Sequence, residues 1–103
     1  MTITKHTDGD TTIIAVEGRL NTMAADEFGN EVNNIIGSAQ NLVFDFEKLD
    51  YISSTGLRVL LFAQKEMNKR GAMKIINVNE AVYEVMHQTG FTAISEIYMK
   101  ESL

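Results

Sequence analysis

Three consecutive hydroxyl side chains, Ser53, Ser54 and Thr55, are the residues of this chain best suited to carry chemistry. They stand between an apolar run at 42–46, typical of a strand, and an apolar run typical of a helix that begins near Thr55. A helix start presents unpaired N–H groups and the positive end of the helix dipole, so a phosphate added there is stabilised. Serine and threonine are also favoured N-caps, each contributing about 1 kcal/mol. The residue types leave both interpretations open, a helix cap and a phosphoacceptor.

Other reactive residues give weaker signals. Asp45, Glu47 and Asp50 precede the hydroxyl run and could form an acid/base pair or a magnesium site, but no histidine is near them in sequence. His6 and His87 belong to different predicted elements and lack the spacing of a zinc site. The chain has no nucleotide-binding glycine motif and no GxSxG nucleophile elbow. We therefore predict a protein that is not an enzyme and that holds no metal or cofactor.

The composition restricts the class of protein. The chain has 103 residues, 45% of them hydrophobic, which is enough for one folded domain over residues 1–103. Its net charge of −5 argues against binding to nucleic acid. It has no cysteine, its first residues lack an apolar signal core, and no run approaches the ~18 apolar residues of a membrane span. We expect a cytoplasmic protein that does not associate with membranes.

The hydroxyl run must be held by neighbouring elements, which alternate between strand and helix patterns. Predicted strands cover residues 2–5, 12–17, 41–46, 73–78 and 94–98, and predicted helices cover residues 22–36, 55–69 and 80–89. This order, β-β-α-β-α-β-α-β, indicates an α/β domain with a mostly parallel sheet and an N-terminal hairpin that turns at Asp8-Gly9-Asp10. The strand at 41–46 is apolar at nearly every position, which predicts that both of its faces are covered. Asn21 or Thr22 is expected to cap the first helix, and Asn79 the third. The apolar residues that recur at helical spacing in the first helix are Ala25, Phe28, Val32, Ile35 and Ile36. Residues 99–103 are expected to be loosely ordered.

Two segments of this pattern are similar to those of a known family. Gly18-Arg19-Leu20-Asn21 follows the second predicted strand, and Leu49-Asp50-Tyr51-Ile52-Ser53-Ser54-Thr55-Gly56-Leu57-Arg58-Val59-Leu60 leads into the second long helix. Together with the order of the elements, these segments resemble the STAS domain over residues 2–99. The resemblance is closest to the stand-alone bacterial anti-sigma factor antagonists.

The resemblance implies a partner-switching role. Antagonists of this kind bind an anti-sigma factor, often a serine kinase, while they are unphosphorylated, and a sigma factor is thereby released. The kinase phosphorylates a serine at the start of the second long helix, and a PP2C-type phosphatase reverses the modification. That serine falls on Ser54, with Ser53 as the alternative acceptor. The implied partner-binding residues are Asn21, Thr22, Met23, Ser53, Ser54, Thr55, Gly56 and Arg58.

Two residues depart from the family pattern. Ser53 stands where an aspartate usually precedes the phosphoserine, and Asn21 stands where an acidic residue is frequent. Both changes reduce the negative charge near the expected kinase contact. The resemblance therefore does not identify the kinase, and the sequence leaves the oligomeric state open.

Two alternatives to sigma-factor control remain. The first is a STAS module of another system, such as a lipid-transport component, a chemotaxis-linked regulator or a stressosome-like assembly. A neighbouring gene for a GHKL-type kinase or a PP2C-type phosphatase would favour sigma-factor control, whereas a neighbouring ABC permease would favour this alternative. The second, least favoured, is a small enzyme that uses Asp45, Glu47 and a hydroxyl group, and it would require a deep pocket with perturbed carboxylates.

Overall fold

The structure is a computed structural model that describes residues 1–101 of the chain. Within these residues, six strands, three α-helices and one short 3₁₀ helix form an α/β domain. The elements follow one another as β1 (Thr2–Asp8), β2 (Thr11–Leu20), α1 (Thr22–Ile36), β3 (Asn41–Asp45), β4 (Leu49–Ile52), α2 (Ser54–Met67), β5 (Met73–Val78), α3 (Glu80–Gln88), η1 (Phe91–Ala93) and β6 (Glu96–Met99). The predicted alternation of strands and helices is confirmed, with one strand more than expected.

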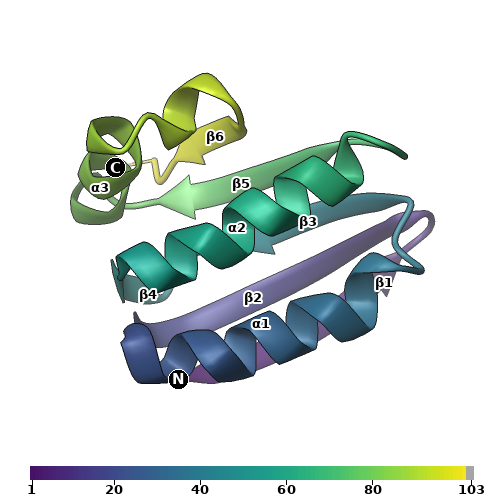
Figure 1. Cartoon of the computed structure of the whole chain (residues 1–103), viewed down its shortest axis with the longest axis horizontal. Helices are drawn as coiled ribbons and strands as arrows, with labels where there is room; N and C mark the ends of the chain where they lie inside the picture. The colour runs from purple at the N-terminus through teal and green to yellow at the C-terminus, as the bar shows by residue number, and fades with distance from the viewer. Residues whose placement is uncertain (102–103) are drawn as a thin grey trace.

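Five strands lie side by side in the order β1-β2-β3-β5-β6, and β4 pairs with the end of β2 (Figure 1). β1 and β2 form an antiparallel hairpin that turns at Gly9, whose φ of 62° is in the left-handed region. The pairs β2–β3, β3–β5 and β5–β6 are parallel. The predicted mostly parallel sheet with an N-terminal hairpin is therefore confirmed, and the carboxyl ends of its parallel strands meet at one edge.

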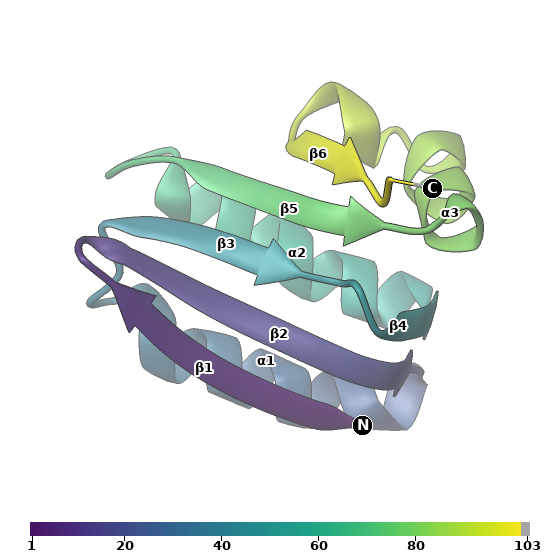
Figure 2. The same ribbon diagram turned by 180° about the vertical axis from the view of Figure 1, so that it is seen from behind.

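One face of the sheet carries α1 and α2, while no helix of residues 1–101 lies over the other (Figure 2). Figure 1 shows the two helices in front of the strands, and Figure 2 shows the strands uncovered from behind. The prediction that the strand at 41–46 is covered on both faces is wrong, because Leu42 and Phe44 are buried whereas Val43 between them is only half-buried. Val43 misled the prediction because β-branched residues also suit the half-exposed face of a sheet.

The hydrophobic core lies between the covered face of the sheet and the two long helices. The rings of Phe28 on α1 and Phe44 on β3 meet edge to face, with their centroids 5.7 Å apart. All five residues predicted to form the apolar face of the first helix are buried, namely Ala25, Phe28, Val32, Ile35 and Ile36. No helix in the described part of the chain combines the length and the apolar character that crossing a membrane requires.

The largest differences from the predicted elements involve β2 and β4. The strand that was expected to end at Gly18 continues to Leu20, with a change of register after Gly18, whose φ is 105°. β4 was not predicted, because its four residues bury only Leu49 and Ile52 and so lack a strand's alternation. These two strands pair with each other directly before α2, so they determine where the hydroxyl run lies.

The helix ends agree with the predicted caps. The side chains of Asn21 and Asn79 accept hydrogen bonds from the backbone of the first turns of α1 and α3. Gly90 follows α3 with a φ of 81°, and the strand predicted at 94–98 begins later, at Glu96, because η1 intervenes and buries Phe91. Of the predicted loose tail, Met99 ends β6, and residues 102–103 lie outside the described residues.

Gly56 allows the first turn of α2 to pack closely on the pair formed by β2 and β4. A methyl group at Gly56 would lie 2.9 Å from Cγ of Leu20 and 3.0 Å from Cγ1 of Ile52, both fully buried. At Gly29 of α1, a methyl group would lie 3.5 Å from Cγ2 of Val59, which is an ordinary contact. The two helical glycines therefore differ in the space available to a side chain.

We predict that Gly56→Ala destabilises the fold by about 1–2 kcal/mol, because overpacking against Leu20 and Ile52 outweighs the better helix propensity of alanine. The matched control Gly29→Ala is expected to be neutral or to stabilise the fold by up to about 1 kcal/mol. Urea unfolding of both variants beside the wild type measures the difference. Equal free energies of unfolding for the two variants would contradict close packing at Gly56.

Candidate functional site

Ser53 is the N-cap of α2. Its backbone is extended, and its Oγ accepts a hydrogen bond from the Gly56 N–H at 3.2 Å and lies 2.8 Å from Oγ1 of Thr55. Its own N–H donates to the Leu20 carbonyl oxygen at 2.8 Å. The side chain is buried, with 6% of its surface exposed. The cap is therefore Ser53, and its hydroxyl is already engaged within the fold.

Ser54 is the first residue of α2 and is exposed to solvent. The helix thus begins one residue earlier than expected, and the capping role falls on the residue before Ser54. Of the two predicted acceptors, Ser54 is accessible at a helix start, whereas Ser53 would have to leave its cap to be modified. The cap and the candidate acceptor are two different residues, a distinction that the residue types alone did not make.

The predicted partner-binding residues of the first helix lie at the same end of the molecule. Asn21 caps α1, with its Oδ1 accepting from the Ala24 N–H at 2.8 Å, and Thr22 and Met23 follow in the first turn. Met23 has 87% of its surface exposed, so it is not the buried packing residue that a methionine usually is. Figure 1 shows the starts of α1 and α2 side by side at one end of the sheet.

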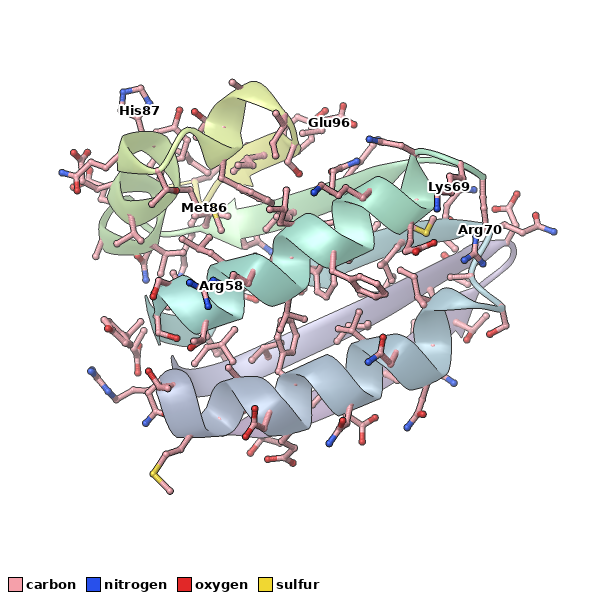
Figure 3. The ribbon with its side chains drawn as sticks, viewed as in Figure 1. Arg58, Lys69, Arg70, Met86, His87 and Glu96 are labelled. Atoms are coloured by element: carbon pink, nitrogen blue, oxygen red, sulfur yellow. The ribbon has the colours of Figure 1, made fainter. Side chains whose placement is uncertain are left out.

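Arg58 lies one turn into α2 and is exposed (Figure 3). It borders two shallow hollows, one on each side of the helix. The first hollow lies between α2 and the segment 89–94, where its lining includes Phe91 and Ile94. The second lies between α2 and α1 and includes Phe62. Arg58 therefore stands beside apolar surface that remains partly open to solvent.

The carboxylates that precede the hydroxyl run do not join it. Oδ1 of Asp45 accepts hydrogen bonds from the Asn77 side-chain amide at 3.0 Å and from the Glu47 N–H at 3.1 Å. Asp45 and Glu47 line a hollow with Thr2 and Thr4 that contains none of the three hydroxyl residues 53–55. Asp50 is exposed on β4. The two carboxylates of the hollow therefore have no hydroxyl nucleophile of the 53–55 run beside them.

The two histidines lie on separate elements. His6 is exposed on β1, and His87 is exposed on α3, where its ring stacks on Tyr83 with 6.2 Å between the centroids. Across the part of the chain that the structure describes, no group of three or more histidine, aspartate or glutamate side chains is arranged to hold a metal ion.

Arg19 and Tyr51 form a surface pair that the sequence did not reveal. The guanidinium carbon of Arg19 lies 4.5 Å from the centre of the Tyr51 ring, a distance typical of a cation–π contact. Their strands place them opposite each other, because Arg19 on β2 is the register partner of Tyr51 on β4. The two residues are far apart in sequence, and their proximity could not be predicted because it depends on β4, which the sequence pattern did not indicate.

Comparison with known proteins gives the chain's relatives. A family model described as the STAS domain matches residues 2–102. BtrV of Bordetella bronchiseptica, provisionally named an anti-sigma factor antagonist, is 31% identical over 84 residues, which cover 80% of this chain and 72% of BtrV.

Solved structures share the fold at lower sequence identity. A crystal structure of an anti-sigma factor antagonist from Mycobacterium paratuberculosis matches with a TM-score of 0.88 at 18% identity, over 94% of this chain and 84% of that one. The anti-sigma factor antagonist SpoIIAA matches in its unphosphorylated form with a TM-score of 0.75 at 17% identity, over 98% of this chain and 90% of that one. SpoIIAA of Bacillus in its phosphorylated form matches with a TM-score of 0.73 at 18% identity, over 93% of this chain and 90% of that one. At these identities the likeness establishes a common fold.

We predict that Ser53→Ala destabilises the fold by about 1–2 kcal/mol, because the Gly56 N–H and the Thr55 hydroxyl lose their partner. Ser54→Ala, the matched control one residue away, removes an exposed hydroxyl and is expected to change the free energy of unfolding by less than about 0.5 kcal/mol. Chemical denaturation of the two variants makes the comparison. A larger loss for Ser54→Ala than for Ser53→Ala would overturn the assignment of the cap.

Proposed function

The chain belongs to the STAS domain family, and from this premise we propose that it acts as an anti-sigma factor antagonist controlled by phosphorylation of Ser54. In its unphosphorylated form it binds an anti-sigma factor that is also a serine kinase, so that a sigma factor is released. The kinase transfers a phosphate to Ser54 and ends the binding, and a PP2C-type phosphatase restores it. The similarity to BtrV, at 31% identity, supports this choice among the possible roles of a STAS domain.

The observation that carries the proposal is the exposed position of Ser54 at the first residue of α2. Because Ser53 caps the helix, the Ser54 hydroxyl is not required for the helix start and remains available to a kinase. A phosphate on Ser54 would lie at the end of the helix that attracts anions. Modification is therefore compatible with an unchanged fold.

The effect of the phosphate on binding follows from its charge. It adds roughly −1.5 to −2 charges at neutral pH. A partner surface that fits a neutral serine hydroxyl would have to desolvate this dianion, at a cost of several kcal/mol. Such a cost is enough to abolish an affinity in the micromolar range. Phosphorylation thus acts as a switch at the contact surface and needs no rearrangement of the core.

The proposed contact surface comprises residues 21–23 and 53–58, from the starts of the two long helices. Met23 contributes an exposed apolar side chain, and Arg58 contributes a cation. The proposal treats residues 1–103 as one STAS domain that works in the cytoplasm as a non-catalytic binding protein. Asn21 and Ser53 carry no charge, so the kinase must accept a less acidic acceptor site than the family pattern offers.

We predict that the anti-sigma kinase encoded in the same genome transfers one phosphate from ATP to Ser54. Intact-mass spectrometry counts the phosphates, and peptide mapping of residues 49–65 locates them. Ser54→Ala should abolish the modification while the protein stays folded. A phosphate on Ser53 instead would show that the acceptor had been misassigned, and no phosphate from a kinase active on another substrate would reject the phosphorylation switch.

We also predict that Ser54→Asp weakens binding to the unmodified anti-sigma factor by about tenfold or more, since it adds a charge at the contact surface. Ser54→Ala should bind within about threefold of the wild type, because it adds none. Titration calorimetry on the three proteins makes the comparison. Equal affinities of the Asp and Ala variants would count against control by charge at this position.

A further inference from the structure

Arg19 contacts an aromatic side chain near the end of β2. The ring of Tyr51 lies 4.5 Å from its guanidinium carbon, and both side chains are exposed. A guanidinium stacked on an aromatic face keeps its N–H donors at its edge, where they can bind a planar acceptor such as a carboxylate. The contact with Tyr51 therefore favours one orientation of Arg19 before a partner arrives.

The backbone next to Arg19 is also hydrogen-bonded to the start of α2. The next residue pair along β2 and β4, Leu20 with Ile52, is buried, and the Ser53 N–H donates to the Leu20 carbonyl oxygen at 2.8 Å. Arg58 lies on α2, four residues after Ser54 and thus about one helical turn away. Figures 1 and 3 show the end of β2, β4 and Arg58 at the same end of the molecule. Both arginines therefore lie at the end of the molecule that carries Ser54.

Neither arginine is neutralised by a partner in the fold. In the described part of the chain, the one pair of opposite charges within 4.0 Å joins Lys69 to Glu66, near the opposite end of α2. Asp50, adjacent to Tyr51 on β4, is exposed but makes no ion pair with Arg19. In a chain of net charge −5, two of the three arginines thus stand unpaired at the end of the molecule that carries Ser54. Arginine, tyrosine and methionine are enriched at the centres of protein interfaces. Tyr51 is exposed beside Arg19, and Met23 is exposed in the first turn of α1.

We propose that this surface recognises a protein partner through acidic side chains, with Arg19 and Arg58 as the residues that determine its specificity. The inference rests on the proposed function and adds the chemistry of the partner to it. A guanidinium binds carboxylates strongly, through two parallel hydrogen bonds. The same complementarity accounts for the switch, because a phosphate on Ser54 would repel acidic side chains of the partner and compete with them for Arg58.

The test reverses the charges one at a time. Arg19→Glu, Arg58→Glu and the double variant are titrated against the anti-sigma factor from the same genome, beside Lys65→Glu, which reverses an exposed charge in the last turn of α2. Each arginine variant is expected to bind about tenfold more weakly than the wild type or worse, and the control within about threefold. Raising the salt concentration should weaken the wild type more than the double variant. Thermal unfolding checks that each variant is folded, and Arg19→Gln replaces Arg19→Glu where it is not.

The outcomes separate the inference from the proposed function. If the wild type binds the anti-sigma factor and the arginine variants bind it equally well or more tightly, the partner surface is not acidic. That outcome would reject the inference and leave the antagonist role in place. An equal loss for Lys65→Glu would also reject it, because the effect would then follow net charge alone. If the wild type does not bind the anti-sigma factor at all, the proposed function and the inference fail together. Tyr51→Leu is expected to weaken binding in the same direction as Arg19→Gln, since Arg19 loses its support.

Discussion

The local structure at the end of the molecule that carries the candidate site depends on two hydrogen bonds of Ser53. Its N–H is bound to the Leu20 carbonyl oxygen at 2.8 Å, and its hydroxyl accepts the Gly56 N–H at 3.2 Å. The first hydrogen bond continues the pairing of β2 with β4, and the second caps the start of α2. Because Asn21, the cap of α1, directly follows Leu20, both long helices start from the same short piece of backbone. The position of Ser54 on the surface follows from this arrangement, since Ser53 before it is hydrogen-bonded both to β2 and to the first turn of α2.

The division of roles between adjacent serines explains how a charge could be added here without disturbing the fold. Ser53 is buried and supports the helix, whereas Ser54 is exposed and supports nothing that the structure describes. A phosphate at the start of a helix meets the positive end of its dipole. In the proposed mechanism, the arginines at this end of the molecule set the sign of the charge that the partner must present.

Much of the fold was predictable because it follows from short-range patterns. The apolar spacing in α1 predicted all five of its buried residues, and Asn21 and Asn79 cap helices as their types suggest. The errors have a common origin in contacts between segments distant in the chain. β4 was missed because two of its four residues are exposed, and its strand character comes only from pairing with β2. The open face of the sheet was missed because an apolar residue such as Val43 is found on half-exposed as well as on buried faces of a strand.

The sequence by itself determined the order of strands and helices, the parallel sheet and the presence of a hydroxyl run at the start of a helix. These features depend on residues within a few positions of one another, where periodicity and capping preferences act. Only the tertiary structure decided which serine caps α2, which one is exposed, and that Arg19 rests on Tyr51. Those outcomes depend on the pairing of β2 with β4 across some thirty residues of chain, and on the burial of Leu20 and Ile52 that fixes its register. Such long-range pairing leaves no local periodicity by which a single sequence could reveal it.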